Sequence, residues 1–185
     1  MTQRQITPPA RLAVTLDQAK ANLRVDGYDM DALITMWVEG IIAVLEHEIG
    51  QCLMRQTWQV TLDAFPLAIK LPHPVLDVTS VKYLDAAGIA QIVPPASYRL
   101  QSSAYATSLI PAKGMAWPST CADVCNVVVD VVCGYGDVPA ATPKNVQLYI
   151  LAKLTEQFDP ATRLERDTVQ SNFVDRLLDA CRTYQ

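Results

Sequence analysis

The side chains best suited to bind a metal ion are five cysteines and two histidines. Cys121 and Cys125 could supply one pair of zinc ligands, joined by Cys133 and by His47 or His73. A zinc knuckle needs two such close pairs, and the chain offers no second one. An odd number of cysteines without a secretion signal favours free thiols in a reducing compartment. The cysteines are therefore predicted to be small buried or half-buried side chains, with no metal site.

Carboxylates and a histidine suggest two further kinds of chemistry. Asp26, Asp29 and Asp31 could line a calcium loop, but no register places alternating oxygen ligands, a glycine and a final glutamate as an EF-hand requires. Acidic residues favoured by a helix dipole are the preferred interpretation. His47 lies between two glutamates and could act as a base, but no nucleophile is spaced to meet it. A solvated histidine near a helix end is expected instead.

Catalytic and cofactor motifs give no candidate residues. Gly134-Tyr135-Gly136 could suggest a phosphate loop, but no Gly-Lys-Ser/Thr element accompanies it and the next basic residue is Lys144. A turn is therefore predicted there. The sequence also lacks His-Glu-x-x-His, Gly-x-Ser-x-Gly and Walker-type patterns. No catalytic, cofactor-binding or metal-binding residue is expected, and the protein is predicted not to be an enzyme.

Composition points to an ordinary globular chain. At 185 residues, half of them apolar, the chain can bury a sizeable core. Its net charge of -4 argues against a broad basic surface that grips phosphates, although DNA could still pass close by. The first residues, Met1 to Ala13, show neither a signal peptide nor a membrane span. We therefore expect a protein made in the cytosol.

The first part of the chain predicts helices behind an extended arm. Residues 1–14 lack amphipathic spacing and contain two adjacent prolines, so an extended arm is expected. Thr15 and Gln18 form a capping box for a short helix that runs to about Leu23. The capping pattern thus marks where the folded helical part begins.

A longer helix is predicted over 31–49, with Asp29 as its N-cap and Gly50 as its stop. Glycine suits the stop because it adopts a left-handed conformation without strain. Apolar residues recur every three or four positions and predict one broad buried face, formed by Leu33, Ile34, Trp37, Val38, Ile41, Ile42, Val44, Leu45 and Ile49. Beyond Gly50 the apolar spacing changes to two, so a strand is expected to follow.

Residues 56–133 predict a β-rich insertion. Short β-forming runs bounded by Pro, Gly, Asp or Ser are Thr57–Asp63, Ala68–Leu71, Val78–Asp85, Ile89–Val93, Tyr98–Leu100, Ser108–Ile110 and Asn126–Cys133. Ala86-Ala87-Gly88 predicts a hairpin, because Gly88 can take a positive φ. The pattern is typical of a small antiparallel sandwich or barrel.

Residues 143–185 predict helices again. Pro143 suits a first helical turn, and an apolar pattern continues to about Phe158. A final helix, Thr162–Tyr184, combines a face of mixed charge with an apolar stripe of Val169, Phe173, Val174, Leu177, Leu178 and Cys181. This stripe could pack on its own domain or dock in a partner's groove, and both possibilities stay open.

The expected fold class is therefore α+β. A helical bundle of N-terminal and C-terminal helices carries an inserted small antiparallel β-sandwich or barrel. Residues 15–185 would form a single domain, in which 15–50 and 143–185 are helical and 56–133 are the insertion.

Short matches in a shared order carry a resemblance to a known family across about residues 15–158. They are Leu16-Asp17-Gln18-Ala19-Lys20-Ala21-Asn22-Leu23-Arg24-Val25-Asp26, Asp29-Met30-Asp31-Ala32-Leu33-Ile34, Leu45-Glu46-His47-Glu48-Ile49-Gly50-Gln51, Gln56-Thr57-Trp58, Leu62-Asp63-Ala64-Phe65-Pro66, Pro74-Val75, Val78-Thr79-Ser80-Val81-Lys82-Tyr83-Leu84-Asp85 before Gly88, Trp117-Pro118, Gly134-Tyr135-Gly136 and Val138-Pro139. With these runs the chain resembles the head-tail connector, or head-completion adaptor, proteins of tailed bacteriophages. It departs from them at Gln51, where members often carry arginine, and in the tail after Asp159.

The resemblance implies a structural virion protein. Members form rings, commonly of twelve copies, that dock under the portal and extend the DNA exit channel. The implied partners are further copies of the chain, the portal protein, the next neck or tail protein, and DNA that passes through the lumen without sequence-specific binding. The implied place is the virion neck, after synthesis in the host bacterial cytoplasm, with no membrane contact. A weakly acidic subunit suits a channel that must not hold DNA.

Two alternatives to a connector stay open. One is another minor neck or tail structural protein, which would share the ring-forming habit. The other is a small-molecule-binding or hydrolase domain, which would need a deep pocket with convergent acids or histidines.

Overall fold

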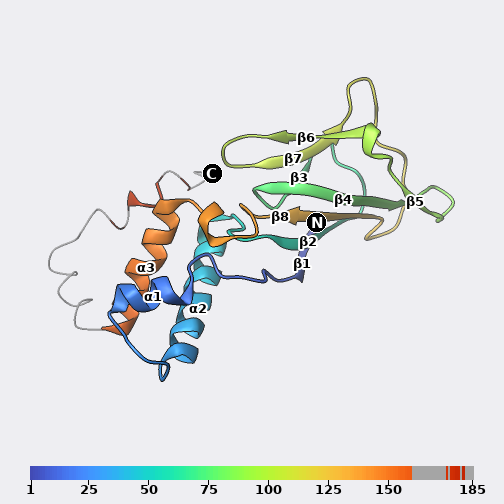
Figure 1. Cartoon of the computed structure of the whole chain (residues 1–185). Helices are drawn as coiled ribbons and strands as arrows, with labels where there is room; N and C mark the ends of the chain where they lie inside the picture. Colours follow the sequence, from blue (N-terminus) through green and yellow to red (C-terminus); the bar gives the residue numbers. More distant parts are fainter. Residues whose placement is uncertain (160–173, 175, 180, 182–185) are drawn as a thin grey trace. The chain divides into compact units, whose positions relative to one another are not determined.

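The computed structural model describes residues 1–159, 174, 176–179 and 181 (Figure 1). Its contacts divide the chain into two compact units. Met1–Pro9 and Arg55–Tyr135 form the first, which we call the β unit, and Ala10–Met54 with Gly136–Gln185 form the second, which we call the helical unit. The described chain thus combines helices with antiparallel sheets and is an α+β protein.

The β unit contains a larger and a smaller antiparallel sheet. The larger sheet has the order β1 (Thr2–Thr7), β2 (Gln56–Leu62), β8 (Val127–Cys133), β4 (Val75–Leu84) and β5 (Ala90–Ile92). The smaller has the order β3 (Ile69–Leu71), β7 (Thr107–Pro111) and β6 (Tyr98–Ser102), and a short 3₁₀ helix η1 (Pro95–Ser97) precedes β6. Every predicted strand is present, with ends shifted by at most three residues.

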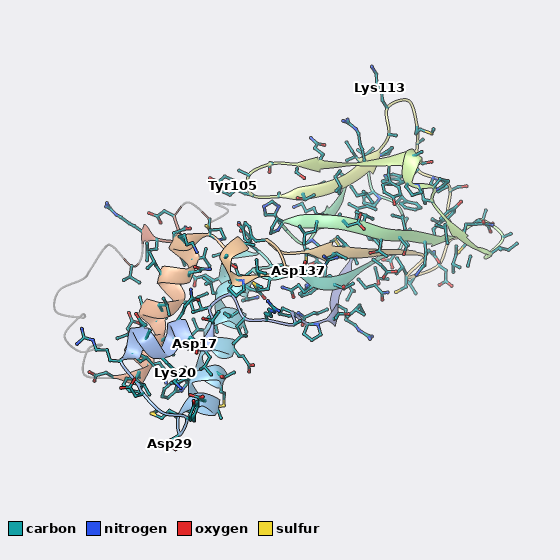
Figure 2. All side chains as sticks on the ribbon, in the orientation of Figure 1. Asp17, Lys20, Asp29, Tyr105, Lys113 and Asp137 are labelled. Atoms are coloured by element: carbon teal, nitrogen blue, oxygen red, sulfur yellow. The ribbon has the colours of Figure 1, made fainter. Side chains whose placement is uncertain are left out.

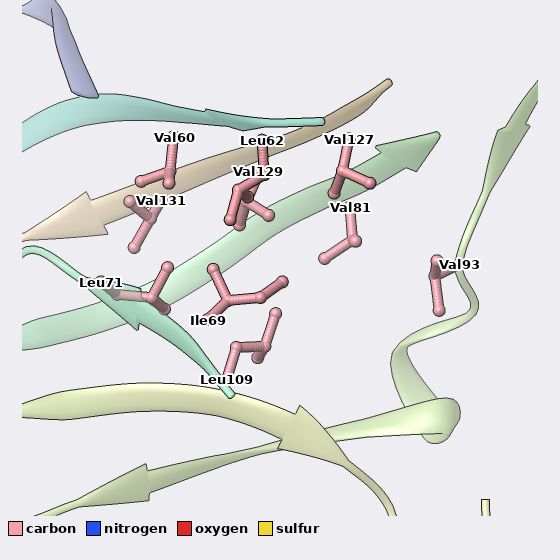
Figure 3. Close-up of a cluster of buried hydrophobic side chains, with 10 residues drawn as sticks. All are labelled: Val60, Leu62, Ile69, Leu71, Val81, Val93, Leu109, Val127, Val129 and Val131. Atoms are coloured by element: carbon pink, nitrogen blue, oxygen red, sulfur yellow. The ribbon is translucent and has the colours of Figure 1, made fainter. Parts of the chain in front are cut away.

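The two sheets share one hydrophobic core (Figure 3). Val127, Val129 and Val131 of β8 are fully buried, whereas the residues between them are only partly buried, because successive side chains of a strand point to opposite faces. Ile69 and Leu109 reach the same core from the smaller sheet. The described strands of the β unit therefore form two separate antiparallel sheets around one core.

Strand β1 lies within the arm that was expected to be extended. It pairs antiparallel with β2, with Thr2 opposite Thr61, and all six of its residues are exposed. No apolar alternation marks such a strand in the sequence, which is why the pattern indicated an arm and not a strand.

The β4–β5 hairpin follows its prediction. Gly88 has a φ of 76°, and the Asp85 carboxylate accepts hydrogen bonds from the N–H groups of Ala87 (2.9 Å) and Ile89 (3.0 Å). The bond from Ile89, with others from Gln91 and Ala87, holds the pKa of Asp85 below its ordinary value. Asp85 and Gly88 therefore fix this turn.

The helical unit contains α1 (Leu16–Leu23), α2 (Asp31–Ile49) and α3 (Lys144–Phe158), and a 3₁₀ helix η2 (Pro139–Ala141) precedes α3. The capping box of α1 is confirmed: the Thr15 hydroxyl accepts from the Gln18 N–H at 3.1 Å, and the Gln18 side chain accepts from the Thr15 N–H at 3.0 Å. None of the described helices is long and apolar enough to span a membrane.

The start of α2 at Asp31 is as predicted, but two residues assigned at helix starts are wrong by one position. The N-cap of α2 is Met30, without a side-chain cap, and Asp29 lies before it (Figure 2). Asp31 occupies the first turn and forms an ion pair there with Lys20. Pro143 is likewise the N-cap of α3 and not part of its first turn. The predicted stop at Gly50 is confirmed, with a φ of 66°.

The three helices pack against one another through apolar faces and a few polar links. Asn22 of α1 donates to the Leu151 carbonyl (3.1 Å) and the Thr155 hydroxyl (2.8 Å) of α3. The Trp37 and Phe158 rings meet edge to face, with centroids 6.2 Å apart. These contacts tie α3 to both α1 and α2.

Most of the final predicted helix lies outside the described residues, namely 162–173, 175, 180 and 182–184. Of the rest, Val174, Leu178 and Cys181 are buried. The Leu177 carbonyl accepts from Asn145 at 2.7 Å, and the Cys181 carbonyl accepts from Gln51 at 2.9 Å. These residues therefore pack on their own helical unit.

Candidate interaction surface

Helix α2 buries one face and exposes an apolar face on its opposite side. The buried residues are Ile34, Val38, Ile42, Leu45 and Ile49, spaced three or four apart as a helix requires. They are the part of the predicted face that the structure confirms. Leu33 and Val44, predicted to belong to the same buried face, are 37% and 68% exposed, so the prediction is wrong for them.

The exposed apolar face, which we call the outer stripe, consists of Leu33, Met36, Gly40, Ala43, Val44 and His47. At about 100° per residue, these six positions fall within a sector about 100° wide, centred opposite the buried face. None carries a carboxylate, lysine or arginine side chain, and Glu39 and Glu48 lie on its two borders. Helix α2 therefore carries a second, exposed apolar face besides its buried one, with charged residues between the two.

Gly40 is the central residue of the outer stripe. Glycine in the interior of a helix costs about 1 kcal/mol relative to alanine, so a glycine there needs a reason. A Cβ atom built at Gly40 meets no atom within 4 Å, so no close contact within the described part of the chain accounts for the glycine. The space beside Gly40 is therefore open.

Lys20 lies in a polar corner between α1 and α2 (Figure 2). The Lys20 ammonium lies 2.7 Å from the Asp31 carboxylate, donates to the Gly27 carbonyl and lies 4.9 Å from the centre of the Tyr28 ring. Its side chain is only 15% exposed. Asp31, one of the three carboxylates considered for calcium, is thus engaged by a lysine.

An open hollow of about 430 Å³ lies beside this corner and is lined by Asp17, Lys20, Ala21, Arg24, Val25 and Asp26. Its walls come from α1 and the turn after it, and the Lys20 ammonium already has its partners there. We therefore interpret the hollow as a solvated surface depression beside a structural ion pair.

A second polar cluster lies on the face of the larger sheet that points away from the core. Asp130 accepts hydrogen bonds from Gln59 (2.9 Å), Ser80 (2.8 Å) and Lys82 (2.9 Å), which come from β2 and β4. Burial would raise the pKa of Asp130, but these donors together lower it. The carboxylate ties three neighbouring strands together.

The cysteines considered for zinc occupy different surroundings in the β unit. Cys133 is buried, and its thiol lies 3.8 Å from the Gln56 carbonyl oxygen. The Cys121 thiol lies 3.2 Å from the Asn126 side-chain oxygen, and Cys125 is exposed. Among the described residues, no three His, Cys, Asp or Glu side chains gather in a way that could hold a metal ion.

The glycines of Gly134-Tyr135-Gly136 serve a close-packed connection between β8 and η2. The Gly134 N–H donates to the Pro74 carbonyl at 2.9 Å. A Cβ atom at Gly136 would lie 2.9 Å from the Cβ atom of Ala141, too close for any side chain. Close approach of the backbone therefore explains the second glycine without a phosphate.

Comparison with solved structures gives the fold a context. The chain matches a chain of the structure described as the virion of a native gene transfer agent (GTA) particle, with 21% identity and a TM-score of 0.79. It also matches a chain of the neck of the empty GTA particle computed with C6 symmetry (19%, 0.79) and one of the neck of the native particle computed with C12 symmetry (19%, 0.76). Each match covers 100% of this chain and 97% of the other.

This chain has the fold of those GTA chains. The likeness includes both the β unit and the helical unit, because the whole chain is covered. No protein-family model matches the sequence, and no curated protein matches it either. The likeness to the GTA chains is thus one of fold.

Proposed function

We propose that this chain is a structural subunit of the neck of a tailed bacteriophage or a phage-like particle. The observation that carries the proposal is the full-length fold match to chains of GTA particles, two of them from necks. The outer stripe of α2 supports it independently, because a subunit that works by assembly needs an apolar surface that its own fold leaves open.

The subunit acts as one member of a closed ring. The matched necks were computed with C6 and C12 symmetry, and both symmetries are compatible with a ring of twelve copies. In this role the ring docks under the portal, extends the DNA exit channel and receives the next neck or tail protein. The net charge of -4 suits a lumen that lets DNA pass without holding its phosphates.

The test is the assembly state of the purified protein, alone and together with the portal protein of the same particle. Native mass spectrometry and negative-stain microscopy should detect rings of a fixed number of copies, at least when portal is present. A protein that stays monomeric at every concentration, and does not bind the portal, would contradict the proposed function.

A further inference from the structure

We propose that the outer stripe of α2 is the seam between neighbouring copies of this chain, and that it receives the ridge of α3 around Leu148 of the next copy. The inference rests on the proposed function, because it names the surface through which a ring subunit meets its neighbour. Leu33, Met36 and Val44 supply the apolar contact, with exposed fractions of 37%, 58% and 68%.

Gly40 and Ala43 are small residues, so the outer stripe has a low point in its surface. Gly40 lies at the centre of the stripe and Ala43 at one edge, both are exposed, and nothing in the described chain comes within 4 Å of a Cβ atom at Gly40. Two small residues between Met36 and Val44 form a shallow gap in the helix surface, into which a ridge of another helix can fit. This gap explains a glycine that weakens its own helix.

A ring requires a second, different patch on each subunit. In a cyclic assembly with more than two copies, one patch contacts a different patch of the next copy, so the stripe needs a counterpart elsewhere. Outside α2, the exposed large apolar side chains of the described helical unit are Tyr28, Val138 and Leu148. Only Leu148 lies within a helix, where it is 50% exposed.

The charges around the two patches are complementary. Lys144 lies one helical turn before Leu148 and is exposed, and Glu39 borders the stripe next to Gly40 and is also exposed. When the Leu148 side chain lies over the gap at Gly40, opposite charges flank the apolar contact, which favours this pairing over a contact between two α2 helices.

The stripe is too small to hold two isolated copies firmly. From Leu33 to His47 the stripe is about 22 Å long, and a helix is about 10 Å wide, so the stripe offers about 220 Å² per copy. A stable interface needs about 800 Å² per partner. The seam is therefore expected to form weakly between two copies and to become stable when a ring gives every copy two neighbours.

The test places a photo-crosslinking residue at Val44 in assembled particles, with the same residue at Ile92 of the β unit as control. Ile92 is 66% exposed, nearly the same as Val44. We expect a chain-to-chain product from Val44 whose crosslinked peptide comes from α3 near Leu148, and no such product from Ile92. A Val44 product with another protein, with residues 160–173 of the same chain, or with α2 of a second copy would overturn the proposed seam.

Failure of the seam can be told apart from failure of the proposed function. If the chain is present in purified necks but Val44 gives no product with α3, the function stands and the seam is wrong. If the chain is absent from necks, the proposed function is wrong. The same probe at Val44 in concentrated purified protein then tests the seam by itself. A product with α3 supports the seam, and the absence of a product overturns it.

A matched pair of charge variants gives a second measurement. Val44→Glu introduces a carboxylate into the seam, and Ile92→Glu introduces one at a site of nearly equal exposure. We expect Val44→Glu to weaken ring formation by about tenfold or more, because the interface would bury an unpaired charge. Ile92→Glu should leave it unchanged. Equal behaviour of both variants, with unaltered circular dichroism, would overturn the seam.

Discussion

Replacing Gly40 separates the stability of the subunit from its assembly. Gly40 is the tenth of 19 residues in α2, away from both frayed ends, and a Cβ atom there meets nothing within 4 Å. Gly40→Ala should therefore add about 0.8–1.0 kcal/mol of helix stability, since alanine loses less backbone entropy on folding. For a chain of this size that corresponds to a rise in Tm of about 2–4 °C.

Gly40→Leu should stabilise the free subunit by nearly the same amount, because leucine is almost as good a helix former as alanine. Its larger side chain would fill the gap between Met36 and Val44, however, and should weaken ring formation by about tenfold, or about 1.4 kcal/mol. The two variants thus have similar helix propensity and differ in the size of the side chain that they place on the outer stripe.

The assays are thermal unfolding by circular dichroism at 222 nm and ring formation by native mass spectrometry. The seam predicts a raised Tm for both variants and weakened assembly for Gly40→Leu. Normal assembly of Gly40→Leu would show that nothing approaches Gly40 closely. A lowered Tm of Gly40→Ala would show that the glycine serves a contact inside its own chain.

Three further substitutions test the fold. Gly50→Val should lower stability by about 1–2 kcal/mol, because Gly50 has a φ of 66° where a side chain is strained; an unchanged Tm would remove its role as helix stop. Leu178→Ala should cost about 2–5 kcal/mol in urea unfolding if this fully buried side chain packs as the structure shows, whereas a surface position would cost under about 0.5 kcal/mol. Burial lowers the pKa of His73 from its ordinary value of 6.5, so the contribution of neutral His73 to folding stability is full above that pH and is lost as the pH falls through the lowered folded-state pKa. His73→Gln should therefore flatten the dependence of Tm on pH below about 6.5, and an unchanged slope would contradict this.

Local signals in the sequence were enough for much of the fold. The capping box at Thr15, the stop at Gly50 and the hairpin at Gly88 each depend on residues close together in the chain, and each was found as predicted. Strand β1 was missed because its residues are all exposed, so its place in the sheet depends on backbone pairing with β2 and not on an apolar pattern.

The outer stripe shows where sequence reasoning could not succeed. Leu33 and Val44 are apolar and helically spaced like Ile34 and Leu45, so the pattern assigned all four to one buried face. Periodicity reports which residues avoid water but not whether the same chain or another one covers them. The signal that could have separated the faces was Gly40, a helix-weakening residue in the middle of an otherwise strong apolar run.

The most direct test of ring membership is a cryo-electron microscopy reconstruction of the neck of the particle that contains this chain. We expect a closed ring below the portal in which each subunit shows the β unit and the helical unit described above, with α2 at the boundary between neighbours. A neck without density for this fold, or a copy of the chain located elsewhere in the particle, would contradict the proposed function.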